Sequence, residues 1–124
     1  MERPGDLGVV GGGFWDAVLA DEGLRLRADE FVILELACRQ LQTISELRAA
    51  FNADPQYMVT GSMKQKVINP LIAEIRVASE SFARHARQLG LPDDPERAAQ
   101  KAAQASEYFR NLGNLSWQVR KGNG

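Results

Sequence analysis

Between Asp29 and Asn52, apolar residues recur every three or four positions, the spacing that places side chains on one face of an α-helix. The stripe consists of Phe31, Leu34, Cys38, Leu41 and Ser45, widened by Ala37, Ile44, Leu47 and Phe51. The polar face consists of Arg39, Gln40, Gln42, Glu46 and Arg48. Asp29 is the expected N-cap, and Pro55 ends the pattern because it disfavours helix in the residue before it. A helix of about six turns predicts a mainly α fold.

Further helices are indicated on both sides of this one. Asn69-Pro70 is a start signal, with asparagine as the cap and proline at the first helical position. The helix that follows has an apolar stripe made of Leu71, Ile72, Ile75, Ala78, Phe82, Ala86 and Leu89, and it ends at Gly90 and Pro92. A fourth, alanine-rich helix begins near Asp94-Pro95. A short helix is expected from Phe14 to Asp21, after a glycine-rich leader.

The stretch between the two central helices predicts a small β-hairpin. Tyr57, Val59 and Val67 are strand formers, and the run 61–64 supplies a short connection. We therefore expect long amphipathic helices with one hairpin near 57–68. The division is a flexible leader at 1–12, a helical core domain at 13–93, and an alanine-rich helix and tail at 94–124.

Composition narrows the class of protein. The chain has 124 residues, 44% of them apolar and 25% charged, as in one globular domain. No apolar run approaches the roughly 20 residues of a membrane-spanning helix, and the N-terminus lacks the apolar block of a signal peptide. We therefore expect a cytoplasmic protein. One cysteine and one histidine make a Cys/His zinc site within the chain untenable.

Charge is distributed unevenly along the chain. Residues 1–62 carry five arginines against ten acidic residues, a net charge of −5. Residues 63–124 carry ten lysines and arginines against six acidic residues, a net charge of +4. Such asymmetry indicates an acidic end that faces protein and a basic end that faces nucleic acid. Head-to-tail self-association and simple scatter are equally good explanations.

No motif indicates catalysis or a cofactor. The run 61–64 has one glycine, its lysine is not followed by serine or threonine, and no helix opens there, so it is not a phosphate loop. Glu74 and Glu80 are six positions apart and point in different directions. His85 lies at the edge of an apolar stripe and is expected to be a half-buried packing residue, and Cys38 a small hydrophobe. We expect no catalytic, cofactor-binding or metal-binding residues, and no enzyme.

Basic residues provide the candidates for DNA binding, and they fall into three groups. They are Lys64 and Lys66 on the hairpin, Arg84 and Arg87 late in the third helix, and Arg120 and Lys121 in the tail. Each group is sparse, so one copy should bind DNA weakly and in a salt-sensitive way. Ordinary solubilising charge explains each group equally well, and a helix C-terminus alone favours Arg84 and Arg87.

Several segments, taken in order, resemble a known family. They are GGGFWDAV, LRADEFVILELACRQLQTISELRAAF, MVTGSMKQKVINPLIAEIR and RQLGLPDD, which together span residues 11–94. The chain resembles the small terminase subunits of tailed bacteriophages, in the group common among phages of actinobacteria. The matching positions are Trp15, Leu26, Asp29, Glu30, Ala37, Cys38, Arg39, Gly61, Ser62, Gln65, Pro70, Leu71, Glu74, Arg76, Leu89, Gly90, Leu91 and Pro92. Lys64 departs from the pattern, which has glycine there, so a different turn geometry is expected.

The resemblance implies a non-enzymatic partner in viral genome packaging that assembles into a ring in the cytoplasm of a bacterial host. Small terminase subunits form rings, recognise the packaging site on double-stranded viral DNA, and regulate the large subunit, which holds the ATPase and nuclease activities. Two alternatives remain open: a dimeric DNA-binding regulator and a structural protein of the virion head or neck.

Overall fold

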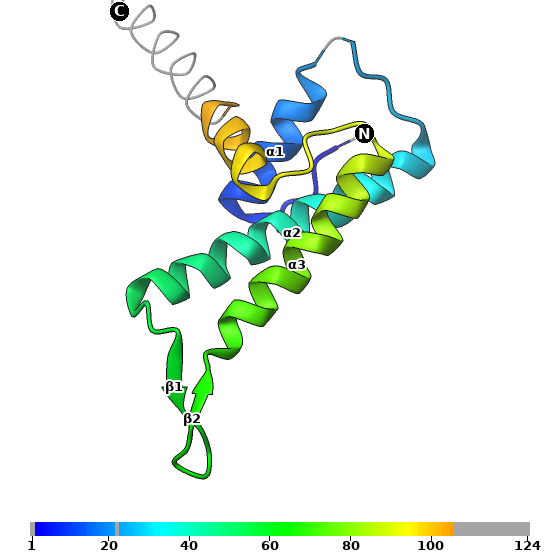
Figure 1. Ribbon diagram of the computed structural model, residues 1–124. Helices are drawn as coiled ribbons and strands as arrows, with labels where there is room; N and C mark the ends of the chain where they lie inside the picture. Colours follow the sequence, from blue (N-terminus) through cyan, green and yellow to red (C-terminus); the bar gives the residue numbers. More distant parts are fainter. Residues whose placement is uncertain (1, 22, 106–124) are drawn as a thin grey trace, which may run out of the picture.

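The computed structural model describes residues 2–21 and 23–105. In this part of the chain the elements are α1 (Gly8–Leu19), α2 (Ala28–Ala53), β1 (Met58–Thr60), β2 (Lys66–Ile68), α3 (Pro70–Gln88) and a fourth helix over 95–105. The strands pair antiparallel, with Val59 opposite Val67. The expected mainly α fold with a hairpin between the two central helices is confirmed (Figure 1). Ring assembly stays a prediction. None of the described helices combines the length and apolar character needed to cross a membrane.

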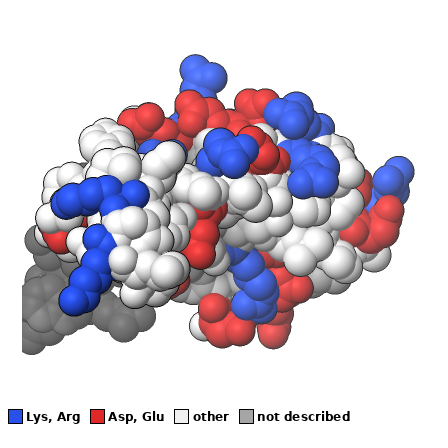
Figure 2. All heavy atoms as spheres, turned by 60° about the horizontal axis from the view of Figure 1, so that its bottom comes forward, with Lys and Arg blue, Asp and Glu red and all other residues white. Residues whose placement is uncertain are grey.

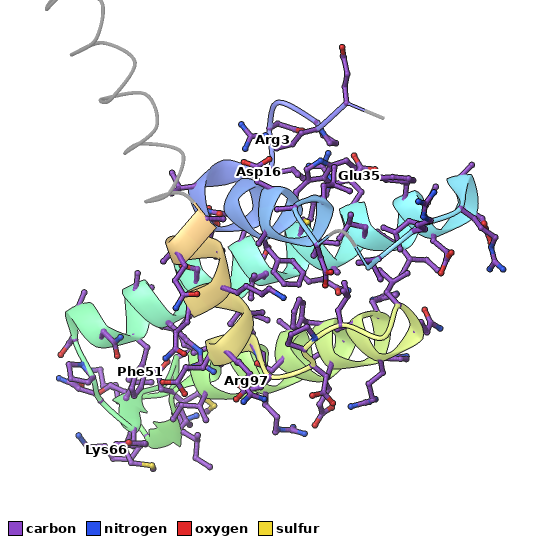
Figure 3. The ribbon with its side chains drawn as sticks, turned by 90° about the horizontal axis from the view of Figure 1, so that it is seen from above. Arg3, Asp16, Glu35, Phe51, Lys66 and Arg97 are labelled. Carbon is purple, nitrogen blue, oxygen red and sulfur yellow. The ribbon has the colours of Figure 1, made fainter. Side chains whose placement is uncertain are left out.

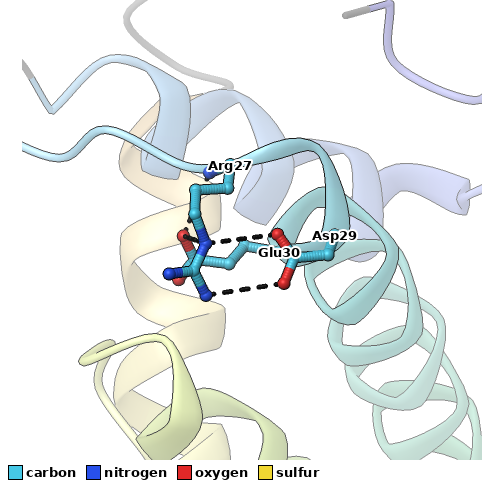
Figure 4. Close-up of polar contacts among 3 residues, drawn as sticks. All are labelled: Arg27, Asp29 and Glu30. Carbon is cyan, nitrogen blue, oxygen red and sulfur yellow. Dashed lines mark hydrogen bonds and ion pairs between the residues drawn. The ribbon is translucent and has the colours of Figure 1, made fainter.

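The start of α2 differs from expectation by two residues. Arg27, not Asp29, is the N-cap, and its backbone is extended. The Glu30 carboxylate accepts a hydrogen bond from the Arg27 N–H at 3.0 Å, while the Arg27 guanidinium donates to both oxygens of Asp29 (Figure 4). A glutamate in the first turn therefore satisfies the backbone N–H of the cap residue itself. The end of the helix at Ala53, two residues before Pro55, is confirmed.

The N-terminal helix includes residues that were expected to belong to a flexible leader. We expected a helix from Phe14 to Asp21, but α1 begins at Gly8 and ends at Leu19, and Gly11 to Gly13 are buried within it. Leu7, just before it, is also buried. The Gln42 side-chain oxygen of α2 accepts hydrogen bonds from the N–H groups of Val10 and Gly11 at 2.9 and 3.1 Å. These bonds satisfy backbone donors that a helix start leaves without partners, so a glycine run can be helical here.

The expected signals at both ends of α3 and at the start of the fourth helix are confirmed. The Asn69 Oδ1 accepts from the Leu71 N–H at 3.1 Å, and Pro70 opens α3. Gly90 has a φ of +69°, a left-handed conformation suited to glycine, and closes the helix. Asp94 caps the fourth helix by accepting from the Glu96 N–H at 3.0 Å. Residues 106–124, including Tyr108 and Phe109, lie outside the described part.

The hydrophobic core lies at one end of the α2–α3 pair. Its buried apolar residues are Leu7, Phe14, Trp15, Ala17, Val18, Leu34, Ala37, Cys38, Leu41, Ile44, Phe82, Ala86, Leu89, Ala98 and Ala102. We call residues 2–44 and 82–105, without the undescribed position 22, the core block. Here α1 and the helix at 95–105 lie close to the α2–α3 pair, and both contribute buried residues to one core (Figure 1).

The other end of the pair has no comparable core. We call residues 45–81 the arm: the last turns of α2, the hairpin and the first half of α3. Asn69 is the one buried residue among them, with 8% of its surface exposed. The expected apolar stripes of α2 and α3 continue through the arm, but their members there are half-buried at most. The hairpin projects beyond the helices at the tip of the arm (Figure 1).

Candidate nucleic-acid interface

The two hairpin lysines sit at the free end of the arm. Lys66 begins β2 opposite Thr60, and Lys64 lies in the connecting turn; both side chains are exposed. Figure 3 shows Lys66 at the same end of the molecule as Phe51 and away from Arg3, Asp16 and Glu35. Their neighbour Met63 is 84% exposed, so the tip presents two cations and one apolar side chain to solvent.

The turn that carries Lys64 has an uncommon backbone. Lys64 has a φ of +64°, in the left-handed region that glycine adopts without strain and that other residues adopt at an energetic cost. The turn is closed by the Gly61 N–H donating to the Gln65 carbonyl at 2.7 Å and the Lys64 N–H donating to the Gly61 carbonyl at 3.0 Å. Lys64 thus keeps the kind of conformation that glycine would favour, and it places a positive charge on the turn.

The hairpin is joined rigidly to α3 through Asn69. Its backbone N–H donates to the Tyr57 carbonyl at 2.8 Å, and its Nδ2 donates to the Gln56 carbonyl at 2.9 Å. The same side chain caps α3, so one residue fixes both the base of the hairpin and the start of the helix. An isolated two-stranded hairpin is marginally stable, and these bonds define its direction relative to α3.

No acidic residue lies close in sequence to the two lysines. Residues 55–73 include no aspartate or glutamate; the nearest acidic residues in sequence are Asp54 and Glu74. The hairpin therefore carries a net charge of +2 from two exposed lysines. Such a surface can attract phosphate, and two charges per copy give weak, salt-sensitive binding.

The arginine candidates lie elsewhere. Arg84 and Arg87 are near the far end of α3, and Arg84 is about 20 Å along the helix axis from the start of α3. Arg87 pairs with Asp93 at 3.1 Å, and the Arg84 Nη2 lies 3.5 Å from the Ser81 hydroxyl. The structure therefore does not bring the two groups together. Arg120 and Lys121 lie outside the described residues.

Basic side chains do not gather into one surface on the hairpin side of the molecule. Figure 2 shows Lys and Arg spread among Asp and Glu on this face, with broad areas of neither. Arg39, for example, pairs with Asp6 at 3.0 Å and Glu35 at 3.1 Å, and its hydrogen bond holds the pKa of Asp6 below its ordinary value. Arg3 likewise pairs with Asp16 at 2.7 Å. These arginines attach the N-terminal segment to the helices, a role that no spacing in the sequence indicated.

The remaining reactive residue types have structural surroundings. Cys38 is fully buried, and this burial raises the pKa of its thiol to about 12, so it exists as a packed thiol. The half-buried His85 has its Nδ1 3.0 Å from the Gln40 side-chain oxygen. Both residues therefore lie as expected. Within residues 2–21 and 23–105, no three His, Cys, Asp or Glu side chains cluster as metal ligands would.

Arg48 lies at the edge of the polar face of α2. It was expected on this face, and its side chain is exposed. It also follows Leu41 and Ile44 by seven and four positions and lines a pocket with them. Arg48 therefore borders the side of α2 that is buried in the core block.

Comparison with family models, curated proteins and solved structures found no match to this chain.

Proposed function

We propose that this chain is a small terminase subunit of a tailed bacteriophage. It would recognise packaging-site DNA as a ring of several copies and regulate a large subunit that holds the ATPase and nuclease activities. Support comes from the order of resembling segments across residues 11–94, and from the agreement between their expected arrangement and the fold: a long helix, a hairpin, and a proline-started helix.

The hairpin carries the DNA-binding part of this proposal. It projects from the arm, bears exposed Lys64 and Lys66, and lies in a stretch without acidic residues from 55 to 73. A two-stranded ribbon is narrow enough to enter a DNA groove or to follow a phosphate backbone. The projection allows the lysines to approach DNA without a clash from the core block.

Assembly supplies what one copy lacks. Two lysines neutralise few phosphates, so the affinity of a single protomer is low. Several hairpins held in one symmetric assembly bind as a multivalent unit, and their effective local concentration raises the total affinity without any new contact. Repetition of the hairpin, rather than a dense basic patch, is therefore the proposed source of DNA affinity.

The experiment is DNA binding by the full chain with Lys64→Glu and Lys66→Glu combined, measured by fluorescence anisotropy over a salt series. Each phosphate contact contributes about 0.9 to the slope of log affinity against log salt, so losing two per bound copy should visibly flatten it. Stimulation of the large subunit's ATPase by viral DNA fragments is the second readout, and it should fall in parallel.

The matched control is Arg84→Glu with Arg87→Glu, which makes the same charge change at the far end of α3. Circular dichroism should show both double variants folded. If the lysine variant binds with native affinity at every salt concentration, the hairpin is not the DNA contact. If the arginine variant alone loses binding, the contact lies on late α3.

A further inference from the structure

The arm carries two shallow apolar grooves beside its two helices. The first, the Val77 groove, has a volume of about 370 Å³ and is lined by Thr43, Leu47, Ala73, Glu74, Val77 and Ala78. The second, the Phe51 groove, has a volume of about 290 Å³ and is lined by Arg48, Phe51, Asn52, Tyr57, Ile72 and Ile75. Each groove contains residues of both α2 and α3.

Helical geometry places the two grooves on different sides of the arm. Ile75 and Val77 are two positions apart, so their side chains leave α3 about 200° apart around the helix axis. Leu47 and Asn52 of α2 are five positions apart, which turns their side chains about 140° apart. The residues of α3 that face α2 lie between the two grooves, so one groove opens on each flank of the helix pair.

Both grooves leave apolar surface in water. Val77 is 55% exposed and Tyr57 is 71% exposed, although the Tyr57 ring packs edge-on against Phe51 with centroids 5.6 Å apart. No apolar residue of the arm is buried. An arm of this kind gains most of its stabilisation only when another surface covers it, since apolar burial is the main favourable contribution to association.

The two grooves carry opposite charges. Glu74 lines the Val77 groove and Arg48 lines the Phe51 groove. Among the described residues, neither has an ion-pair partner. Arg48 also lines an adjoining pocket with Glu96, yet no ion pair joins those two side chains. A surface that supplies an apolar strip and one carboxylate would fit the Phe51 groove, and the Val77 groove of a second copy is such a surface.

We propose that the arm of one copy packs through its Val77 groove against the Phe51 groove of the next copy, with Glu74 facing Arg48. This inference rests on the self-association that forms part of the proposed function, and it names the surfaces that meet. Because the grooves lie on opposite flanks, each copy contacts two neighbours head to tail. Such contacts build a closed ring or an open chain with more than two members, not a two-fold dimer.

The test uses charge reversal in the full chain, with assembly measured by native mass spectrometry and sedimentation velocity without DNA. Arg48→Glu alone places two carboxylates at each contact, and Glu74→Arg alone places two guanidinium groups there. We expect either change to raise the concentration needed for assembly by at least about tenfold, because like charges at an interface are strongly unfavourable. Arg25→Glu and Glu80→Arg are matched controls outside both grooves and should assemble normally.

Mixing the two variants gives the decisive measurement. In a 1:1 mixture, copies that alternate restore an opposite-charge pair at every contact, so assembly should return to within a few-fold of the native concentration. The same is expected of the chain with both substitutions. Recovery on mixing also shows that each variant is folded, and thermal denaturation checks this independently.

Three results overturn the inference. They are native-like assembly of both single variants, failure of two folded variants to assemble when mixed, and a native assembly that stops at a dimer. If the native chain forms large assemblies that the reversals leave unchanged, the named surfaces are wrong while the proposed function stands. If the native chain is monomeric at every concentration, the assembly part of the proposed function fails as well.

Discussion

The core block and the arm contain the same two helices, yet only the core block buries them. In the block, α1 and the helix at 95–105 add further surfaces to the α2–α3 pair, so that Phe14, Leu34 and Phe82 lose all contact with water. In the arm, the same apolar spacing continues without a covering layer, and Ile72 and Ile75 stay half-buried. An amphipathic stripe therefore only permits burial. Its side chains become buried where a further layer of helices packs on them.

The two regions therefore differ in what they contribute to the protein. The core block contains all the buried apolar residues of the described chain, and these include residues from the start of α2 and the end of α3. The arm, which such a core does not stabilise, carries the exposed hairpin, the two apolar grooves and the groove charges Arg48 and Glu74. A region stabilised by its own core and a region that we propose is stabilised by a second copy can be distinguished by mutation.

The largest expected effect compares two positions on α3. Phe82 is fully buried and packs edge-on against Phe14, with ring centroids 5.7 Å apart. Phe82→Ala should lower the free energy of unfolding by about 3–5 kcal/mol, the usual cost of a large cavity. Ile75→Ala, seven residues earlier in the arm, should cost only about 1 kcal/mol because its side chain is half-buried. Urea denaturation at a protein concentration that keeps the chain monomeric measures both.

Equal losses at the two positions would contradict the division into core block and arm. The assembly assay should give the complementary result. Ile75 lines the Phe51 groove, so Ile75→Ala should weaken assembly of the chain more than it lowers the stability of the fold. A loss of folding stability from Ile75→Ala as large as that from Phe82→Ala would show that the arm has a core of its own.

A smaller effect is expected within the glycine run of α1. A Cβ at Gly11 would come within 2.6 Å of the Cys38 carbonyl oxygen, which belongs to the backbone of α2 and cannot swing aside. Gly11→Ala should therefore destabilise the protein by about 1–3 kcal/mol as α1 is pushed from α2. At Gly12 the nearest atom is the Arg3 Nη1 at 3.1 Å, the end of a flexible side chain that needs to shift by only a few tenths of an ångström and can keep its ion pair with Asp16. Gly12→Ala should be neutral or stabilising by up to about 1 kcal/mol, since alanine favours helix.

Thermal denaturation by circular dichroism distinguishes the two glycine variants. If Gly11→Ala leaves the melting temperature unchanged, α1 does not depend on close approach to α2. The helix content of Gly12→Ala provides the internal control, because it tests alanine in the same helix without the close contact to the Cys38 carbonyl oxygen.

The glycine run also shows what a sequence can and cannot predict here. Asn69-Pro70, Gly90 and Asp94-Pro95 identify helix ends because each acts on its own neighbours, through a cap, a left-handed residue or a fixed φ. Gly11 to Gly13 looked like a leader because glycine disfavours helix in isolation. Their helical state depends on Gln42 and on the Cys38 backbone, about thirty positions away, and no local pattern contains that contact.

The candidate site also combines features with local sequence signals and features that depend on contacts distant in sequence. The hairpin and its lysines could be placed from strand formers and a turn, which are local signals. The grooves could not, because they exist only where α2 and α3 lie side by side without a third layer. Arg48 was expected to be exposed and is exposed, but its place beside two pockets depends on how α2 packs against α3 and the fourth helix.

The smallest expected effect concerns the tip of the arm, where Lys64 has a φ of +64°. Glycine adopts this conformation without the roughly 1 kcal/mol strain of a residue that has a Cβ. Lys64→Gly should therefore slow exchange of the Gly61 and Asn69 amide hydrogens, which are bonded to the Gln65 and Tyr57 carbonyls, by about fivefold. Met63→Gly is the control, because Met63 lacks the left-handed backbone and should gain nothing. Hydrogen exchange followed by NMR measures both variants.

This substitution also separates hairpin order from hairpin charge. Amides of the core block, such as the Leu41 N–H, should exchange at native rates in Lys64→Gly because the core block does not depend on the tip. A change in their exchange would show that the two regions unfold together. DNA binding should weaken despite the more ordered hairpin, because one phosphate contact is lost per copy and the salt slope falls by about 0.9 for each. If binding instead strengthens, the order of the turn matters more to DNA than the charge of Lys64.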